Sequence, residues 1–177
     1  MLSAKKVKAA NLKRVKQLLE QDFPKEERLP SWLLYLLSLR KTVGFYLFYD
    51  ENAFVGFTYL IYSAEMTFVF YLDVNAKKRS QGYGAEILSW IKAVSKTAPV
   101  VLNIEQVDPK APNYEQRKKR KAFYLRNGFA ETGSFENYQD APYEILSTAP
   151  EFSKEAYVRL FRQYSFGVYT SRFSSKK

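Results

Sequence analysis

The chain has 177 residues, of which 46% are hydrophobic and 17% aromatic, so it can bury a core and fold as one domain over 1–177. It contains no cysteine and no histidine, which excludes disulfides, thiolate zinc sites and catalysis by thiol or imidazole. The formal net charge of +10 suits an anionic ligand but does not identify one. The opening segment has no apolar signal region and no apolar stretch approaches the roughly 20 residues that cross a bilayer, so we expect a cytoplasmic protein without a membrane partner.

Two helices are expected before the central strands. In Asn11–Asp22 the apolar residues recur on one helical face, and Asn11 is a candidate cap. Pro30 and Ser31 open a second, apolar helix that runs to about Arg40, because proline is tolerated in a first turn and serine caps helices.

Aromatic and β-branched residues dominate the next part of the chain. The segments 43–49, 53–62 and 67–74 predict three successive antiparallel strands. Asp50–Asn52 has the chemistry of a turn, and Ser63–Glu65 is a second candidate turn.

The remaining half predicts helices that alternate with strands. In order, these are a helix over 85–96, a strand over 99–107, a helix over 113–127, strands over 129–137 and 142–148, and a terminal helix over 150–164. Asn113 and Gln116 resemble a capping box, and Gly128 suits the left-handed position after a helix. The order indicates an α/β or α+β domain with a mixed, mostly antiparallel central sheet flanked by helices. The core of this domain is expected over about 5–148, followed by a C-terminal helical segment over about 150–165. One parallel crossover is expected within 67–105.

The loop before the helix at 85–96 contains Gly82 and Gly84, two of only 7 glycines. Glycine permits a sharp turn with uncovered amides, and a helix N-terminus adds orphan N–H donors and the positive end of the dipole, so the loop suits a phosphate. No P-loop is present, and the dinucleotide fingerprint fails because Ile87 stands three positions after Gly84. The remaining pattern, Arg79-x-x-Gly82-x-Gly84, also fits an ordinary turn.

Together with its flanks, this loop resembles the acyl-CoA-binding motif of the GNAT N-acetyltransferase superfamily, in which a strand feeds R/Q-x-x-G-x-G/A and then a helix. The matching stretch is LDVNAKKRSQGYGAEIL, Leu72–Leu88. A second block, FYLRNGF at Phe123–Phe129, is similar to the late F-Y-x-x-x-G-F segment of that family. The resemblance covers roughly residues 5–148 and implies a GNAT-like fold, acetyl-CoA as co-substrate without a metal, and a primary amine as acceptor.

The resemblance also implies how the coenzyme is held. Backbone amides from Ser80 to Ala85 would cradle the pyrophosphate, Arg79 would add charge beside it, and the strand edge Leu72–Val74 would bond the pantetheine arm. The cofactor-binding residues implied in this way are Leu72, Asp73, Val74, Arg79, Ser80, Gln81, Gly82, Tyr83, Gly84, Ala85, Arg117 and Tyr124.

The implied chemistry is direct attack of a neutral amine on the thioester, with an N–H near Leu72 stabilising the oxyanion. Tyr124 occupies the family's tyrosine position and is the candidate acid for the departing thiolate; the alternative is that it only positions the sulfur. Glu105 stands at the end of an apolar strand and is the candidate base, with a strand-end ion pair as the alternative.

Arg117 departs from the family pattern, which places an asparagine seven residues before the tyrosine. Arginine cannot accept the same hydrogen bond, so we expect it to reach a phosphate instead. The basic run 117–121 is most simply solvated helix surface; the CoA 3′-phosphate and nucleic acid are the alternatives, and no recognisable nucleic-acid module accompanies it.

The leading interpretation is an acetyl-CoA-dependent N-acetyltransferase whose acceptor is a small-molecule or peptide amine. The alternatives are a catalytically weak or inactive acyl-CoA-binding module with the same fold and, less favoured, a basic nucleic-acid-binding protein. The loops expected to select the acceptor, 23–42 and 131–143, contain no transferable code, and a homodimer stays open.

Overall fold

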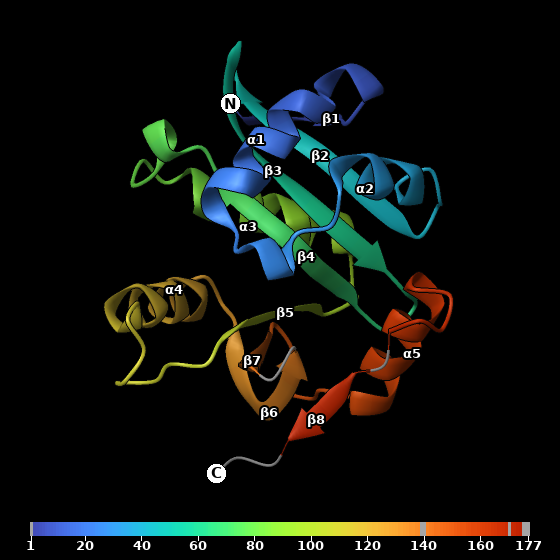
Figure 1. The fold of residues 1–177 in the computed structure, drawn as a ribbon, viewed down its shortest axis with the longest axis vertical. Coiled ribbons are helices and arrows are strands. Elements are labelled where there is room, and N and C mark those ends of the chain that lie inside the picture. The colour runs from blue at the N-terminus through green and yellow to red at the C-terminus, as the bar shows by residue number, and fades with distance from the viewer. Residues whose placement is uncertain (1, 139–140, 170, 175–177) are drawn as a thin grey trace. The chain divides into compact units, whose positions relative to one another are not determined.

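The computed structural model describes residues 2–138, 141–169 and 171–174 (Figure 1). The chain divides into two compact units. The first unit contains the residues up to Tyr62 together with Val69–Val94, and the second unit contains Ser63–Phe68 together with the residues from Ser95 onward.

The described residues form eight strands and five α-helices. The strands are β1 (Leu2–Lys6), β2 (Val43–Asp50), β3 (Ala53–Tyr62), β4 (Thr67–Val74), β5 (Val100–Glu105), β6 (Ala130–Tyr138), β7 (Ala141–Ser147) and β8 (Arg172–Ser174). The helices are α1 (Leu12–Asp22), α2 (Ser31–Leu37), α3 (Tyr83–Ser95), α4 (Tyr114–Arg126) and α5 (Lys154–Tyr164), with short 3-10 turns at Ala9–Asn11, Lys25–Glu27 and Ala76–Lys78. Hydrogen-bonded neighbours follow the order β1-β2-β3-β4-β5-β7-β6-β8, and β4 pairs with β5 in parallel. This mixed, mostly antiparallel sheet with its helices confirms the predicted fold class.

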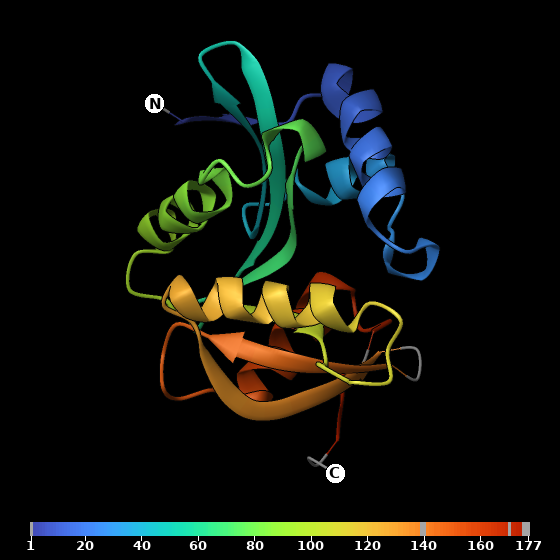
Figure 2. The same cartoon turned by 90° about the vertical axis from the view of Figure 1, so that its left-hand side faces the viewer.

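In the first unit both faces of the strands are covered. β3 is buried along almost its whole length, which is typical of a strand with helices on both sides. Figure 2 shows α1 and α2 on one face of β2, β3 and β4, and α3 on the other face. The buried helix residues are Val15, Leu18 and Leu19 in α1 and Ile87, Leu88 and Ile91 in α3.

Tyr71 in β4 fixes the segment that connects α1 to α2. Its hydroxyl donates to the Glu27 carbonyl and accepts a hydrogen bond from the Leu29 N–H at 3.1 Å. Its ring also meets the ring of Phe23 edge-on, with the centroids 5.1 Å apart. The connection between the helices is therefore anchored to β4, in the same unit as the glycine loop.

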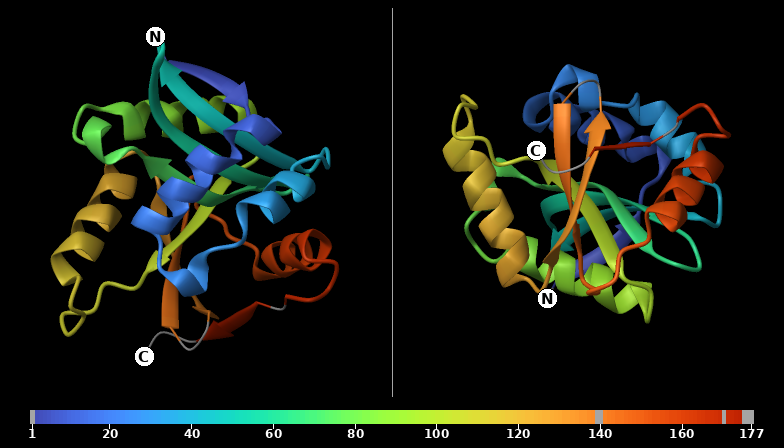
Figure 3. Two further views of the ribbon diagram at one scale, coloured as in Figure 1. Left: turned by 45° about the horizontal axis from the view of Figure 1, so that its top comes forward. Right: turned by 90° about the horizontal axis from the view of Figure 1, so that it is seen from below.

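The second unit is built on β5, β7, β6 and β8, which pair antiparallel in that order. Figure 3 shows α4 and α5 on opposite sides of β6 and β7. Glu136 of β6 is only 1% exposed, and it accepts hydrogen bonds from the hydroxyls of Tyr157 and Tyr169, both at 2.6 Å. Because a buried carboxylate needs partners, these two hydroxyls tie the C-terminal part of the chain to β6.

Element ends differ from the sequence-based expectation in several places. The edge strands β1 and β8 were not expected, because LSAKK and RFS are too short and too polar to show strand alternation. α3 begins at Tyr83 rather than Ala85. α5 begins at Lys154 rather than Pro150, because Ser153 caps it by accepting a hydrogen bond from the Ala156 N–H.

Two predicted helix caps are wrong. Asn11 accepts a hydrogen bond from the Lys8 N–H at 3.0 Å and does not cap α1. Asn113 precedes α4, but its side-chain oxygen accepts from Arg117 at 2.7 Å, so there is no capping box. The left-handed conformation predicted for Gly128 is confirmed by its φ of 79°.

Gly56 provides a test of how tightly β3 and β4 pack. A Cβ atom at this position would lie 2.1 Å from the Asp73 carbonyl oxygen, so Gly56→Ala should lower the free energy of unfolding by about 3 kcal/mol. A Cβ at Gly133 would meet nothing within 4 Å, so Gly133→Ala should cost only about 1 kcal/mol, from its positive φ. Urea unfolding of both variants measures this, and equal losses would contradict the prediction.

Candidate active site

The loop from β4 to α3 has an unusual backbone for a short connection. Asn75 accepts a hydrogen bond from the Lys77 N–H and thereby caps the 3-10 turn that opens the loop. Ser80 and Gly82 then have φ angles of 61° and 89°, in the region that favours glycine. Gly82 therefore satisfies a backbone requirement, whereas Ser80 stores strain that its surroundings must hold.

Five consecutive amides of this loop are open. The N–H groups of Ser80–Gly84 have no intramolecular acceptor among the described residues. The Ala85 N–H donates to the Gly82 carbonyl at 3.0 Å and so already has an acceptor, and its place in the cradle stays a prediction. A Cβ at Gly82 would meet nothing within 4 Å, and the space beside the loop is unobstructed there. Open N–H groups at the start of α3 form a site suited to an anion.

Arg79 anchors the start of this loop to the protein. Its Nη2 lies 2.6 Å from Asp22 Oδ1 and 3.2 Å from Asp73 Oδ1, and its Nε donates to the Val74 carbonyl at 2.9 Å. We expected Arg79 to add free positive charge for a phosphate. Instead, two carboxylates offset the charge, and the side chain holds the loop.

Tyr83 anchors the other side of the loop. Its hydroxyl donates to Asp50 Oδ2 at 2.7 Å, and Lys78 Nζ lies 5.7 Å from the centre of its ring. The hydrogen bond lowers the pKa of Asp50 and raises the pKa of Tyr83. The open amides therefore lie between two side chains that are each bound to a carboxylate.

Asp73 is a buried acid next to another acid. Burial raises the pKa of its carboxyl group to about 7, and the negative charge of Asp22 acts in the same direction. The positive charge of Arg79 opposes this shift without cancelling it. Asp73 therefore titrates in the neutral range, unlike an ordinary aspartate.

The edge of β4 near Leu72 is open as well. The Asn75 N–H donates to the Val55 carbonyl of β3, so by strand alternation Leu72 presents its backbone groups to the opposite edge. The parallel pairing of β4 with β5 ends at Phe68 and Val101. The backbone N–H and C=O of Leu72 therefore lie beyond the residues of β4 that pair with β5.

Glu105, in the second unit, is engaged by two arginines. Its Oε1 lies 2.8 Å from Arg117 Nη2, and its Oε2 lies 3.1 Å from Arg120 Nη1. Arg117 also donates to the Gln106 carbonyl at 2.9 Å and to Asn113. The arginine expected to reach a phosphate is therefore held in an internal network, which agrees with the strand-end alternative for Glu105.

Tyr124 lies on α4 with its ring against two phenylalanines, Phe123 at 5.3 Å and Phe129 at 5.6 Å between centroids. Its hydroxyl has no hydrogen-bond partner within the described part of the chain. Burial raises the pKa of Tyr124, and the positive charge of Arg120 only partly offsets this. The phenol therefore stays protonated at neutral pH and keeps a proton to donate.

The basic run 117–121 is not simply solvated surface. Arg117 and Arg120 pair with Glu105, as described above. Lys121 Nζ lies 2.8 Å from both Glu131 and Glu144. Three of the five basic side chains are thus neutralised by carboxylates of the same unit, which leaves little free charge for a nucleic acid.

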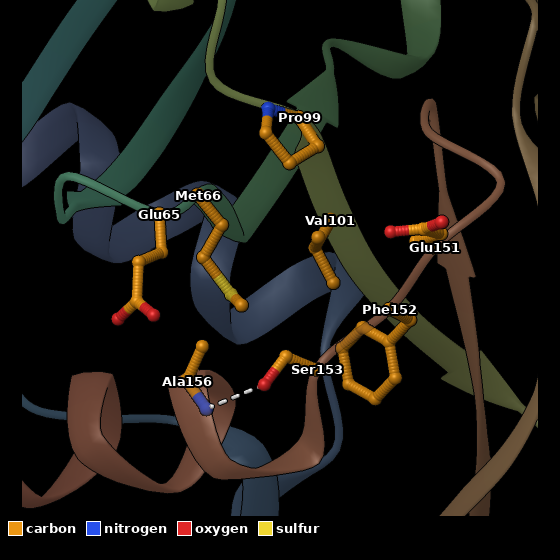
Figure 4. Close-up of a pocket in the computed structure, with 8 residues that line it drawn as sticks. All are labelled: Glu65, Met66, Pro99, Val101, Glu151, Phe152, Ser153 and Ala156. Atoms are coloured by element: carbon orange, nitrogen blue, oxygen red, sulfur yellow. Dashed lines mark hydrogen bonds between the residues drawn. The ribbon is translucent and has the colours of Figure 1, made fainter.

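A separate cavity of about 280 Å³ lies in the second unit, beside the N-terminus of α5 (Figure 4). Met66, Val101 and Phe152 contribute apolar walls, and Glu65 and Glu151 carry the acidic groups. It contains none of the residues expected to bind or react. Among the described residues, no group of three or more acidic side chains could hold a metal ion, and no helix is long and apolar enough to cross a membrane.

Sequence reasoning missed Asp22 and Asp50, the two carboxylates outside β4 that hold the loop. Asp22 ends α1, where an acidic side chain is unfavourable for the helix dipole, and this was a signal that it has another partner. Asp50 was assigned to a turn because of its residue type, and nothing nearby in the sequence points to Tyr83.

The shifted pKa of Asp73 predicts how stability depends on pH. The folded protein keeps a proton that the unfolded chain releases, so this group lowers the free energy of unfolding as the pH rises from about 4 to about 7. Asp73→Asn removes the titration and should raise that free energy by about 2 kcal/mol at pH 8, with the gain vanishing near pH 4. Urea unfolding at several pH values measures it; Glu20→Gln, in an exposed pair with Lys16, is the control. A gain that does not vary with pH would contradict the assignment.

Comparison with known proteins gives matches in structure but not in sequence. No family model and no curated protein matches the chain. A solved structure from Bacteroides thetaiotaomicron, described as an acetyltransferase from the GNAT family, is 22% identical and has a TM-score of 0.73, covering 94% of this chain and 99% of its own.

Two further solved structures contain coenzyme-derived ligands. Arabidopsis thaliana Naa50 in complex with the bisubstrate analogue CoA-Ac-MVNAL is 18% identical with a TM-score of 0.64, covering 84% of this chain and 98% of its own. An aminoglycoside 6′-N-acetyltransferase complexed with coenzyme A is 16% identical with a TM-score of 0.66, covering 85% of this chain and 99% of its own. With its strand order and its open loop before α3, the chain has the fold of the GNAT acetyltransferases.

Proposed function

We propose that the protein is an N-acetyltransferase that transfers the acetyl group of acetyl-CoA to a primary amine. The observation that carries this proposal is the row of open amides in Ser80–Gly84 at the start of α3. Such a row suits a pyrophosphate, because several N–H donors converge on one anion and the helix dipole adds a positive potential. The fold shared with acetyltransferases that bind coenzyme A supports the same assignment.

The proposed coenzyme contacts are mostly made by the backbone. Leu72–Val74 would bond the pantetheine arm with its open edge, and Ser80–Gly84 would bind the pyrophosphate. Asp73 and Arg79, given their ion pair, would contribute by holding the loop rather than by touching the phosphates. Coenzyme recognition of this kind tolerates changes in exposed side chains such as Gln81, because amides do the binding.

In the proposed reaction the neutral amine attacks the thioester carbonyl carbon directly. A C–N bond forms, the C–S bond breaks and coenzyme A leaves as a thiolate. The N–H of Leu72 would donate to the oxygen that becomes negative in the tetrahedral intermediate. The excess proton of the new ammonium passes to a base, and the thiolate takes a proton from an acid.

Tyr124 is the proposed acid. Its hydroxyl is not committed to another group within the described residues, and its raised pKa keeps it protonated over the neutral range. A protonated phenol can donate its proton to the thiolate as the C–S bond breaks and then regain a proton from solvent.

Glu105 is the proposed base, acting through a water molecule. Its two ion pairs with Arg117 and Arg120 occupy both carboxylate oxygens, and they support a second candidate function. This second candidate is an acyl-CoA-binding module that has the fold but turns over slowly or not at all. The acceptor of the enzyme is a small-molecule or peptide amine, by analogy with the bisubstrate analogue CoA-Ac-MVNAL in one structural neighbour and the aminoglycoside named in the description of another.

The coenzyme loop can be tested through the φ of Gly82. Gly82→Ala meets no atom but forces a β-carbon into a positive-φ conformation, which should weaken coenzyme A binding about tenfold. Calorimetric titration with acetyl-CoA measures the affinity, and a thermal shift confirms binding to the folded state.

Gly133→Ala is the matched control for this variant. Gly133 also has a positive φ, of 69°, and open space around it, but it lies in β6. It should lose a similar amount of stability and keep full affinity for acetyl-CoA. Equal affinity in Gly82→Ala and Gly133→Ala would count against the loop, and a wild-type protein that does not bind acetyl-CoA would refute the proposed function.

The proton-transfer roles can be separated by kinetics. With an amine that the wild type acetylates, Tyr124→Phe should lower kcat about 100-fold with little change in KM for acetyl-CoA.

Glu105→Gln should remove the acidic limb of the pH–rate profile if Glu105 is the base. Loss of thermal stability with an unchanged profile would instead assign Glu105 to the ion-pair network. Release of free thiol across a panel of amines provides the readout.

A further inference from the structure

We propose that Asp22 and Asp73 act as positioning residues for the coenzyme loop and that coenzyme binding is coupled to the uptake of one shared proton by this pair. The inference rests on the proposed function, since it concerns the same loop. It concerns residues that do not themselves touch the coenzyme.

The two carboxyl groups meet on a single nitrogen atom. Asp22 Oδ1 lies 2.6 Å and Asp73 Oδ1 lies 3.2 Å from Arg79 Nη2. The side chain of Asp73 is 8% exposed and that of Asp22 is 18% exposed, whereas Arg79 is 47% exposed. The acids therefore lie inside and the guanidinium covers them from the loop.

The other oxygen of each acid has no partner. Asp22 Oδ2 and Asp73 Oδ2 are both buried and accept no hydrogen bond within the described part of the chain. Two ionised carboxylates against one guanidinium leave one excess negative charge beside two buried carboxylate oxygens, which is unfavourable. A single proton shared by the pair removes that charge and lets the protonated acid donate to the other.

The pair is connected directly to the open amides. Arg79 is followed by Ser80, whose φ of 61° begins the row of unpaired N–H groups. Arg79 also holds the Val74 carbonyl at 2.9 Å, so its side chain fixes the end of β4 to the start of the loop. A change in the charge of Asp22 and Asp73 alters how firmly they hold Arg79. It therefore alters the orientation of the N–H groups of Ser80–Gly84.

A pyrophosphate bound to these amides would place negative charge next to the pair. Like charge disfavours the second ionisation, so the coenzyme should favour the protonated pair. By linkage, the protonated pair then favours the coenzyme to the same degree. The charged groups that face Asp73 are Asp22 from α1 and Arg79 from the loop, and with them the pKa of Asp73 is raised to about 7.

The direction of the pH effect follows from this scheme. Below that pKa the proton is already bound, and coenzyme affinity is highest. Above it the free protein has lost the proton and must take it up again on binding, so the dissociation constant rises with pH, by up to about tenfold per unit. Asp73→Asn is neutral at all pH values and can donate a hydrogen bond to Asp22, so it imitates the protonated state.

The experiment is calorimetric titration of the whole chain with coenzyme A between pH 7 and 9, in buffers of different ionisation enthalpy. This range lies above the second pKa of a phosphate monoester, near 6, so the ligand contributes little to proton exchange. We expect the wild type to take up a fraction of a proton on binding and to lose affinity as the pH rises. Asp73→Asn should take up none and show a flat affinity profile. Glu20→Gln, on the same helix as Asp22, should behave like the wild type.

Asp22→Asn provides a second variant in case Asp73→Asn folds poorly, because it also leaves one acid against Arg79 and should abolish proton uptake. Binding by the wild type without proton uptake, or with the same uptake in the Asn variants, would overturn the inference and leave the proposed function intact. Failure of the wild type to bind coenzyme A at any pH would overturn both.

Discussion

The N–H groups of Ser80–Gly84, which find no acceptor in the described part of the chain, set the requirements for the surrounding loop. The N–H groups of Tyr83 and Gly84 lie in the first turn of α3, which has no intrahelical acceptors for them, and the backbone of Ser80–Gly82 before that turn follows neither a helix nor a strand. It must turn in conformations such as those of Ser80 and Gly82, and for serine the left-handed region costs about 1–2 kcal/mol. The loop therefore keeps its shape only if neighbouring contacts hold it.

Those contacts come from side chains at both ends of the loop. Arg79 ties the start to α1 and β4, and Tyr83 ties the far side to the end of β2. Each tie ends on a carboxylate, so the guanidinium of Arg79 and the phenol of Tyr83 are already engaged. The basic character of the chain thus says little about ligand binding, and the same holds for α4, where Arg117, Arg120 and Lys121 are bound to glutamates.

The features that could be predicted from the sequence are those with a local cause. Gly82 follows from a backbone angle, and the strands of the first unit follow from runs of aromatic and β-branched residues. The contacts that fix the site join residues far apart in the chain, such as Asp22 with Arg79 and Asp50 with Tyr83, and no periodic pattern encodes them.

The roles expected for single side chains were harder to infer for the same reason. The type of a residue determines which hydrogen bonds and ion pairs its side chain can form. Its role depends on which partner lies next to it in the folded protein. Asn113 has the chemistry of a cap, yet Arg117 occupies its oxygen. Arg79 has the charge for a phosphate, yet two acids occupy its guanidinium. Tyr124 could be singled out because FYLRNGF, Phe123–Phe129, resembles the late GNAT segment, and its role as the acid stays a prediction.

The carboxylate of Glu136 has a consequence for the order in which the second unit can assemble. Its two hydroxyl partners, Tyr157 and Tyr169, are synthesised after every strand of that unit except β8. Of the side-chain partners that Glu136 has in the folded unit, only the Asn103 amide of β5, at 3.4 Å, is synthesised before α5. The burial of this carboxylate with all of these partners is therefore completed only after Tyr169 has been synthesised.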